Sequence, residues 1–447
     1  MTAAQKVPVV RHACPSLAEP MVTGDGLLVR LKPIPSGLSP HQWQALADAA
    51  LQFGNGRLEI SSRGNIQVRG LRAETVPHLV TAMAAAEITF ADGPAIDSHP
   101  LAGARQSGDS AISDLTDALR HVLSGPVLSG PVLSGHVLSG HVLSGSGDGH
   151  RLTQSLAAKT SIVIDGAGPS GRADMLADLI ADLRFNKDPA GWQVRVGGTQ
   201  LTGRLIGCVD QDAALPFAVE ALKCIAAHGP QARGRDLDDG DVDHLSAHGL
   251  QTIKTPAAGQ IKPLQLGVMA LAQDKWALSL QPAFGALAGA LLKALARQLI
   301  GFDGTVMHAA AGKKLLIEPL TKVQAGRLQA DLATLGFVVS DSDQRQQFLT
   351  CVGAPGCASA HLNTHAMAQK LAAKPPAADS KTAVIHVSGC PKACARPAKF
   401  DAEILGHADG VTITDNRVTP ASDGLRKWLT AAVNDRFTGP TMDQRTP

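Results

Sequence analysis

The sequence predicts an α+β protein made of two pseudo-symmetric halves, each a ferredoxin-like unit followed by a larger α/β domain. The first observation behind this prediction is an internal repeat. The segment that begins at Leu27 matches the segment that begins at Trp276 without a gap over about 45 residues, at a constant offset of 249. Phe53, for example, corresponds to Phe302. Self-similarity of this length predicts a duplicated structural unit.

The second observation is an apolar stripe that both copies share. Apolar residues recur at the i, i+3, i+4, i+7 and i+8 positions of a one-sided helix. In the first copy they are Trp43, Leu46, Ala47, Ala50 and Leu51, and in the second copy they are Leu292, Leu295, Ala296, Leu299 and Ile300. The stripe predicts an amphipathic helix near residues 40–52 and an equivalent helix in the second copy.

Each copy has the element order strand, helix, strand, strand, helix, strand, which is the order of a split βαβ or ferredoxin-like unit. In the first copy we expect strands at 27–32, 57–61, 65–70 and 87–90, with helices at 40–52 and 75–86. In the second copy we expect the closing helix and strand at 322–335 and 336–340. The expected units are the first ferredoxin-like unit 1–90, the first α/β domain 91–255, the second ferredoxin-like unit 256–340 and the second α/β domain 341–447.

The composition excludes several classes of protein. Apolar residues make up 44% of the chain and charged residues 18%, which is too apolar for a disordered protein. The 41 basic and 39 acidic residues leave a net charge of +2, so no basic field favours a nucleic-acid partner. The N-terminus lacks the apolar core of a secretory signal, and the most apolar stretch, 282–296, is too short to cross a membrane. We expect a cytoplasmic protein without a membrane or nucleic-acid partner.

Residues 121–145 consist of five consecutive pentapeptides that all end in Val-Leu-Ser-Gly. A period of five matches neither a helix nor a strand, so we expect a surface loop that has grown by tandem expansion. Lengthening a loop is thermodynamically cheap, at about 0.6 kcal/mol per doubling. The histidines that begin three of the pentapeptides offer a weak metal site as the alternative.

A Gly-x-Gly-x-x-Gly pattern at Gly166, Gly168 and Gly171 stands between an expected strand and an expected helix. A dinucleotide-binding fold needs a second parallel strand that ends in Asp or Glu about 20 residues later. The sequence instead continues as two strands around a Lys-Asp-Pro-Ala-Gly turn. We therefore expect no nucleotide site at this pattern.

Four of the seven cysteines fall close together and carry the strongest chemical signal. Cys351, Cys357, Cys390 and Cys394 have the spacing C-x5-C-x32-C-x3-C. Structural zinc sites usually contain cysteine pairs with a two-residue gap, and neither pair here has that gap. The spacing favours an iron–sulfur cluster, which needs one thiolate for each iron corner. A zinc-stabilised structural site is the alternative.

A polar strand lies in the first copy of the repeat. In Ser62–Gly70, SRGNIQVRG, the period of two places Arg63, Asn65, Gln67 and Arg69 on one face. Arginine pairs bidentately with carboxylates, so this face predicts a cradle for a carboxylate-rich ligand, with a solvent-facing sheet surface as the alternative. At the matching positions the second copy has Gly312, Lys314, Leu316 and Glu318. The polar face is largely lost there, and we expect only the first copy to bind.

The cysteine spacing, the SRGNIQVRG strand, the duplicated unit and the strand that ends in Val196-Gly197-Gly198 together resemble the nitrite and sulfite reductase iron–sulfur family. The segments CPSLAEPMVTGDGLLVRL and CVGAPGCASAH are similar to the oxygen-dependent branch of this family that acts in cobalamin biosynthesis. The resemblance covers about residues 11–430 outside the repeat loop. It implies that the larger α/β domain of each half is of the reductase type.

The resemblance also implies roles for particular residues. The four cysteines match the ligands of a [4Fe-4S] cluster, and Cys394 matches the ligand that bridges to sirohaem iron in the reductases. Arg63 matches an active-site arginine, and Lys159 matches the first of a lysine pair. Ser161 replaces the second lysine, and the segment that should supply another arginine has none before Arg105. Losing two cations weakens a small-anion site by roughly 3–6 kcal/mol, which favours a pocket rebuilt for a large tetrapyrrole.

The implied activity is hydroxylation of a tetrapyrrole macrocycle with molecular oxygen, in which a ring acetate closes to a lactone. Arg63 and Lys159 are the expected catalytic residues, and Arg63, Asn65, Gln67, Arg69 and Lys159 are the expected substrate contacts. An additional iron site, as sirohaem or non-haem iron, belongs to the same expectation. The electrons are expected from a separate donor protein.

Two other functions stay open. A sirohaem-dependent sulfite or nitrite reductase would share the fold and the cluster, and bound sirohaem with anion turnover would identify it. A non-enzymatic iron–sulfur electron carrier would depend on the cysteines and not on Arg63. The sequence does not name the ligands of a second iron, but among the nearby histidines His361 ranks ahead of His365, His386 and His407. Cys14 is expected to be a buried thiol.

Overall fold

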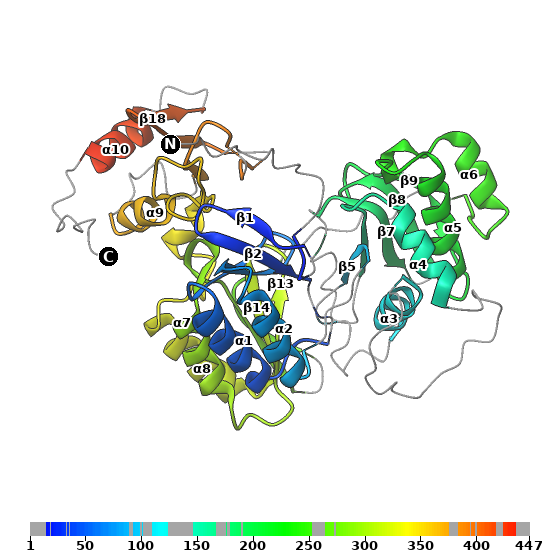
Figure 1. Ribbon diagram of the computed structural model, residues 1–447, viewed down its shortest axis with the longest axis horizontal. Helices are drawn as coiled ribbons and strands as arrows, with labels where there is room; N and C mark the ends of the chain where they lie inside the picture. The colour runs from blue at the N-terminus through cyan, green and yellow to red at the C-terminus, as the bar shows by residue number, and fades with distance from the viewer. Residues whose placement is uncertain are drawn as a thin grey trace.

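The computed structural model describes residues 15–17, 19–32, 34, 36–88, 93–98, 101, 110–123, 146–166, 176, 179–188, 191–252, 264–271, 274–374, 383–393, 395–397, 400–416 and 423–434. This part of the chain contains four β-sheets with helices packed on them, and the predicted α+β class with two related halves is confirmed (Figure 1). Cys14, Arg105, Gly168, Gly171 and Cys394 lie outside the described residues, as do positions 124–145 of the pentapeptide run. Of the helices described, none has the length and apolar character needed to cross a membrane.

The first sheet forms around the first copy of the repeat, in the order β1-β2-β4-β3-β12. Its strands are Met21–Thr23 (β1), Gly26–Leu31 (β2), Ile66–Leu71 (β4), Arg57–Ile60 (β3) and Ala286–Ala288 (β12). Helices α1 (Pro40–Phe53) and α2 (Val76–Ala85) bury their apolar residues in the same core as this sheet. Helix α1 begins where the local sequence favours it, because Ser39 and Gln42 form a capping box and Pro40 opens the first turn.

The second sheet is built from the second copy, in the order β10-β11-β14-β13. Its strands are Gly267–Ala270 (β10), Trp276–Leu280 (β11), Lys314–Leu320 (β14) and Val306–Ala310 (β13). The accompanying helices are α7 (Gly289–Leu299) and α8 (Lys322–Thr334). Thr321 and Gln324 form the capping box of α8, so the closing helix of this copy also begins at a local sequence signal.

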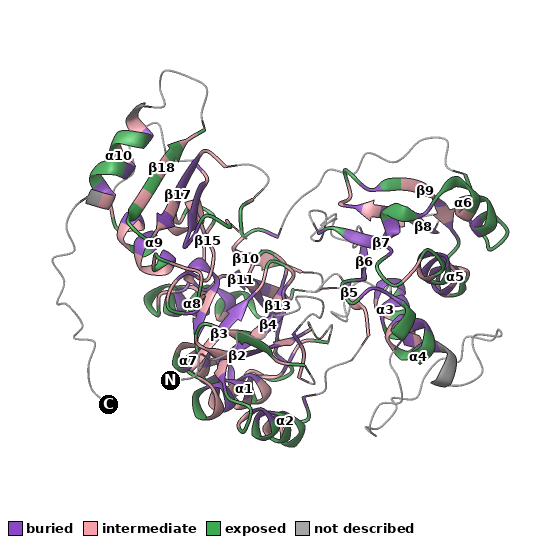
Figure 2. Ribbon diagram, turned by 45° about the horizontal axis from the view of Figure 1, so that its top comes forward, coloured by how far each residue is buried: buried purple, intermediate pink, exposed green. Residues whose placement is uncertain are grey.

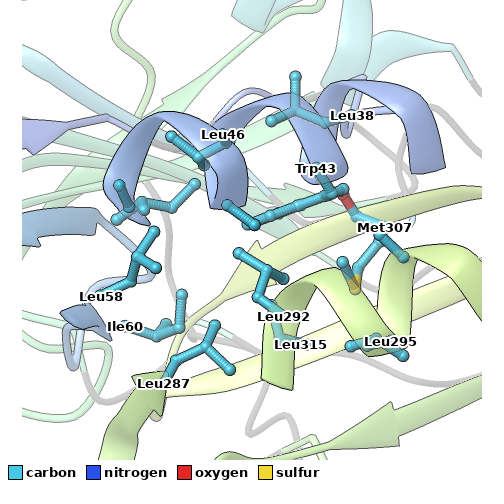
Figure 3. Close-up of a cluster of buried hydrophobic side chains, with 14 of the residues drawn as sticks. Leu38, Trp43, Leu46, Leu58, Ile60, Leu287, Leu292, Leu295, Met307 and Leu315 are labelled. Carbon is cyan, nitrogen blue, oxygen red and sulfur yellow. The ribbon is translucent and has the colours of Figure 1, made fainter. Parts of the chain in front are cut away.

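Residues of one copy pair through their backbones with residues of the other copy, and the two pairings are related by a pseudo-twofold axis. Leu38 pairs with Met307 in an isolated bridge, and Leu287 pairs with Leu58 where β12 joins β3. The repeat offset of 249 converts one of these pairs into the other. Trp43 reinforces the first pair, since its Nε1 donates to the Met307 carbonyl at 2.8 Å. The duplicated units therefore share one core, in which α1 packs against α7 (Figure 3).

The predicted apolar stripe is buried at its first four positions in each copy. The fifth position is wrong in both, since Leu51 is 44% exposed and Ile300 is 39% exposed. Eight residues along an α-helix the side chain has turned by about 80° from the starting direction, so the i+8 position lies at the border of the stripe. Ile300 also follows the last residue of α7.

Each copy is followed by a mixed sheet whose strands run in chain order. The third sheet contains Ala95–Ser98 (β5), Ser161–Gly166 (β6), Ala181–Asp188 (β7), Gly191–Gly198 (β8) and Arg204–Val209 (β9). The fourth contains Phe348–Thr350 (β15), Ile385–Ser388 (β16), Ala402–His407 (β17) and Gly410–Asp415 (β18). In both sheets the first three strands are parallel and the fourth is antiparallel, as expected of related halves.

The remaining helices cover these two sheets. They are α3 (Ala111–Leu123), α4 (Ser146–Ser155), α5 (Ala214–Ala227), α6 (Asp239–Ser246), α9 (Thr364–Ala372) and α10 (Asp423–Asn434), with the 3-10 turns η1 (Gly234–Asp236), η2 (Ala283–Gly285) and η3 (Gln344–Gln347). Strands β5 to β9 with α3 to α6 form one lobe, and the other three sheets form the second lobe (Figures 1 and 2). Buried strands lie under helices whose outer surfaces are exposed (Figure 2).

The closing strands of the ferredoxin-like units differ from the prediction. The described residues of the expected strand 87–90 are Glu87 and Ile88, and neither is in a strand. The expected strand 336–340 contributes a single bridge between Val338 and Gln281. The sheets are instead extended by β1 and β10, which precede the repeat. The predicted Lys-Asp-Pro-Ala-Gly hairpin is confirmed, since β7 and β8 pair antiparallel.

Candidate functional site

Two of the predicted cysteine ligands follow neighbouring parallel strands. Cys351 comes directly after β15, and Cys390 comes two residues after β16. Because β15 and β16 run parallel, their carboxyl ends meet at one edge of the sheet. The Cys351 amide donates to the Val387 carbonyl at 3.2 Å, and the Gly389 amide donates to the Cys351 sulfur at 3.2 Å. The two cysteines therefore lie at the same sheet edge.

The loop after β15 returns Cys357 to this edge. The His361 amide, four residues beyond Cys357, donates to the Gly389 carbonyl at 2.7 Å. A Cβ atom on Gly389 would approach the Ala360 Cβ to 2.7 Å, so this close contact requires glycine. The structure thus brings the loop that carries Cys357 to the edge that Cys351 and Cys390 share, and Cys394 lies outside the described residues.

The donor set at this edge suits an iron–sulfur centre. The three described cysteines are free thiols, and soft thiolates are the ligands that such centres require. The amide of Gly389 already points at the Cys351 sulfur, and hydrogen bonds of this kind tune the reduction potential of a cluster. Cys390 is buried, at 7% exposed, which limits the access of water.

Arg69 anchors the cysteine loop to the first sheet. Its side chain is 3% exposed, and its Nη2 donates to the Gly356 carbonyl at 2.5 Å. The same guanidinium pairs with Asp25, with Nη2 to Oδ1 at 2.8 Å and Nε to Oδ2 at 3.1 Å. Gly24 allows this approach, because a Cβ there would lie 2.6 Å from the Ala358 amide. The structure thus buries Arg69 in contacts within the protein, where the sequence predicts a substrate contact.

Two carboxylates surround Arg69 in different electrostatic states. Burial raises the pKa of Asp25, but the hydrogen bonds from Arg69 and its neighbours outweigh burial and hold that pKa below its usual range. Burial raises the pKa of Glu59, and the charge of Arg69, with Nη1 3.8 Å from the Glu59 oxygen, lowers it only in part. The cysteine loop is therefore anchored through an ion-paired aspartate, beside a glutamate that is more easily protonated.

Arg63 and Asn65 lie in the turn between β3 and β4 and not on the strand, which corrects the prediction that four polar residues share one strand face. The chain reverses here because the Gly64 amide donates to the Ser61 carbonyl at 2.9 Å, and Gly64 has a φ of 77°. Asn65 is 6% exposed and lies 3.3 Å from the Ser61 hydroxyl. Gln67 is half-buried on β4, opposite Glu59.

Arg63 reaches the third sheet from this turn. Its Nη1 donates to Asp97 of β5 at 2.9 Å, and its Nη2 donates to the Ile180 carbonyl just before β7. Lys159 is exposed in the turn before β6, and its carbonyl accepts a hydrogen bond from Arg233 at 3.1 Å. Arg233 also pairs with Asp182 of β7 at 2.9 Å, so Lys159 lies near the start of β7, as Ile180 does. The two residues predicted to be catalytic therefore lie at one edge of the third sheet.

The second copy makes the equivalent connection to the fourth sheet. Lys313 occupies the turn between β13 and β14, and its Nζ donates to the Thr350 carbonyl at 3.2 Å, next to Cys351. Burial lowers the pKa of Lys313, while the nearby Glu59 and Cys351 raise it. Gly285 allows the lysine chain to pass, because a Cβ there would lie 2.5 Å from its Cδ. Sequence analysis missed Lys313, since the matching turn residue in the first copy is Gly64.

The four histidines near the cysteines have different environments. His361 is exposed, and its backbone amide supports the cysteine loop. His365 on α9 lies 3.5 Å from Arg57 and stacks on Phe284. His386 on β16 is fully buried, with its Nδ1 2.8 Å from a Glu403 oxygen. His407 ends β17. These contacts lie within the protein and leave the ligands of any second iron unassigned.

We expect acid to weaken the contact between α9 and the first sheet through His365. Burial and the neighbouring cations lower the pKa of His365 from 6.5 to about 4, so this side chain stabilises the fold in its neutral form. That contribution is complete above pH 6.5, falls as the pH decreases towards 4, and amounts to about 3 kcal/mol. Urea unfolding at pH 7.5 and pH 4.5 should show a larger acid loss for the natural protein than for the variant His365→Gln.

The control for this measurement is His361→Gln, which changes an exposed histidine four residues away. It should leave the acid loss of the natural protein unchanged. An equal acid loss in the natural protein and in His365→Gln would contradict the assignment.

The paired ferredoxin-like units, the two mixed sheets and the sheet edge that carries Cys351 and Cys390 define a nitrite/sulfite reductase-type protein. Residues 19–86 match the family described as "Nitrite/Sulfite reductase ferredoxin-like half domain". The solved structure of the Mycobacterium tuberculosis NirA protein superposes with a TM-score of 0.62 at 19% identity, covering 87% of this chain and 73% of that chain. A ferredoxin–nitrite reductase of Synechococcus elongatus is 22% identical over 86% of this chain and 77% of its own length.

Another relative has a higher sequence identity to this chain than these two proteins. The precorrin-3B synthase of Sinorhizobium sp is 33% identical over 415 residues, which cover 93% of this chain and 84% of that protein. The chain therefore belongs to the precorrin-3B synthase family.

Proposed function

We propose that the protein converts precorrin-3A to precorrin-3B in aerobic cobalamin biosynthesis. In this reaction C20 is hydroxylated with molecular oxygen, and the ring A acetate closes to a lactone. The observation that carries the proposal is the 33% identity to a precorrin-3B synthase over 93% of the chain. The replacement of an expected lysine by Ser161 supports it, because Ser161 is buried beside Asp182 and supplies no cation for a small anion.

The proposed cofactor is a [4Fe-4S] cluster held by Cys351, Cys357, Cys390 and Cys394. When bound, such a cluster supplies single electrons to a neighbouring reaction centre. The protein holds the ligands in place through the Gly389 amide at the Cys351 sulfur and through the buried contact between Arg69 and the cysteine loop. An additional iron, as sirohaem or non-haem iron, is part of the proposal.

The reaction adds one atom of O2 to the substrate as the C20 hydroxyl oxygen and reduces the other atom to water with two electrons and two protons. The ring A carboxyl closes the lactone by adding to a double bond of the macrocycle, which needs no further oxidant and releases no leaving group. We propose that a separate donor protein delivers the electrons. Arg63, 29% exposed, and the exposed Lys159 are the proposed contacts for substrate carboxylates, with Gln67 as a polar neighbour. Asn65 and Arg69, at 6% and 3% exposed, would act by holding the turn and the cysteine loop.

The test is turnover of precorrin-3A by anaerobically purified protein after addition of labelled oxygen gas and a reductant. We expect one labelled oxygen atom in the product, and iron with acid-labile sulfide in the purified protein. Unlabelled product would contradict the oxygenase proposal. Bound sirohaem together with nitrite or sulfite turnover would favour the reductase function, which the similarity to a ferredoxin–nitrite reductase makes the second candidate.

The proposal also includes the division into units 1–90, 91–255, 256–340 and 341–447 and a cytoplasmic location. Sheets one to four each have their first strand within a different one of these ranges, which supports the division.

A further inference from the structure

A small pocket lies where the two ferredoxin-like units meet the third sheet. Its volume is about 20 Å³, which is room for about one water molecule. The polar residues that line it are Arg63, Asp97, Ser98, Arg120 and His308. They come from three places, namely the β3–β4 turn, the third sheet with α3, and β13. The pocket is therefore lined by residues of both copies of the repeat and by residues of the lobe that Arg63 contacts.

Oδ1 of Asp97 and Nδ1 of His308 are buried polar atoms on residues that line this pocket, and neither has a hydrogen-bond partner among the described residues. Each of these two residues is 4% exposed. A buried polar atom without a partner costs about 1–3 kcal/mol, so such atoms usually mark a bound water or ligand. The other oxygen of Asp97 accepts from Arg63 at 2.9 Å. A water in the pocket would link His308 to Asp97 and through it to Arg63.

His308 is held in one orientation. Its Nε2 lies 3.1 Å from an oxygen of the buried Glu318. A carboxylate can only accept, so Nε2 carries the proton of this bond, and the lone pair of Nδ1 has no partner among the described residues. The ring lies against Gly37, where an added Cβ would come within 2.9 Å of it, so the glycine leaves room for the imidazole. The arrangement is a carboxylate–histidine pair with one free basic nitrogen.

The repeat indicates that this pair is a modified version of the Arg69 contact. The offset of 249 places His308 at the position of Glu59 and Glu318 at the position of Arg69. In the first copy the cross-strand pair supports the cysteine loop, and in the second copy it faces the pocket. The exchange removes the arginine and introduces an imidazole, a group that can both accept and donate a proton.

We propose that His308 is a proton-relay residue for the reaction, acting through a water in this pocket; the inference rests on the proposed oxygenase function. Nδ1 of His308 gives a proton to the pocket water, which passes a proton to Asp97 on the substrate side of Arg63. Nδ1 regains its proton from a solvent water that exchanges into the pocket. Hydroxylation consumes two protons for every two electrons that the donor protein supplies, so each turnover draws on this path. Glu318 acts as a positioning residue, since it holds the ring from outside the pocket. Among the described residues, the charged groups that line the pocket are Asp97, Arg63 and Arg120.

The test compares His308→Gln with His244→Gln in the full chain with its cluster loaded. Glutamine can still donate to Glu318 but cannot carry a proton. We expect kcat to fall about 100-fold with an unchanged KM for precorrin-3A, since general acid–base groups contribute about 10²–10⁴-fold. His244 pairs with Glu220 at 3.0 Å on the surface, so His244→Gln should leave kcat unchanged. The solvent deuterium isotope effect on kcat should rise in His308→Gln.

Two further variants separate proton relay from a structural role. In His308→Ala, added imidazole should restore part of the activity, because it can occupy the vacated volume and carry the proton. Glu318→Gln should lower kcat about 10-fold, because the carboxylate no longer fixes which nitrogen of His308 carries the proton. This variant tests the proposal if the His308 variants do not fold. Wild-type kcat in His308→Gln, or a loss that neither imidazole nor deuterated solvent affects, would overturn the relay. Failure of the natural protein to form labelled product would instead overturn the proposed function.

Discussion

The variant Cys390→Ala is expected to lose the iron–sulfur cluster and to lower turnover by at least about 100-fold. Cys390 lies two residues after β16, at the sheet edge that Cys351 shares, and it is 7% exposed. A cube of four irons needs a thiolate at each corner, and a buried alanine offers neither a ligand nor access for water to replace it. Iron and acid-labile sulfide, measured on anaerobically purified protein together with precorrin-3A turnover, check the prediction.

The matched control is Cys224→Ala. Cys224 is also a buried free thiol, at 8% exposed, but it lies on α5 in the core of the other lobe. Removing its sulfur should cost about 1 kcal/mol of stability and leave iron, sulfide and turnover unchanged. Full iron and sulfide in Cys390→Ala would contradict the ligand assignment, and zinc without sulfide in the natural protein would point to the structural alternative.

Much of the fold follows from the repeat. The gapless offset of 249 predicts both ferredoxin-like sheets, and the structure applies the same offset to the pairs Leu38–Met307 and Leu287–Leu58. The common position of Cys351 and Cys390 could also be predicted from the sequence, because residues that follow neighbouring parallel strands must meet at one edge of the sheet. These features depend on the repeat and on the regular geometry of strands, and both can be recognised in the sequence.

The environment of the polar residues in the segment Ser62–Gly70 could not be predicted from the sequence in the same way. Strand periodicity shows that Gln67 and Arg69 share a face, but it does not show what covers that face. Arg69 is buried by Gly356, which is 287 residues away in the chain, and it is neutralised by Asp25. Arg63 was misplaced for a more local reason, since Gly64 turns the chain before β4 begins.

The pair His308 and Glu318 shows what a further signal could have been. A histidine among apolar strand residues is usually satisfied within the core, so on its own it carries little weight. The repeat matches it to Glu59, however, and a polar residue at the same strand position in both copies indicates a face that is not ordinary core. Comparing polar residues between the copies would have identified both buried pairs.

The second large effect is expected from Arg69→Met. The substitution keeps much of the side-chain volume but removes the cation between Asp25 and Glu59, and it removes the donor to the Gly356 carbonyl. Leaving a buried carboxylate unpaired destabilises a fold by about 3–5 kcal/mol. We expect a clear fall in the urea midpoint and faster loss of iron in air, because the cysteine loop is no longer tied to the first sheet.

The double variant Arg69→Met with Asp25→Asn isolates the charge. Asparagine needs no cation, so the double variant should recover part of the stability that the single variant loses. The loop contact at Gly356 stays broken in both, and iron should therefore be lost from both at similar rates. Arg72→Met, which changes an exposed arginine three residues along the chain, is the control and should behave like the natural protein. Slow iron loss from Arg69→Met would show that the buried arginine stabilises the sheet without holding the cluster loop.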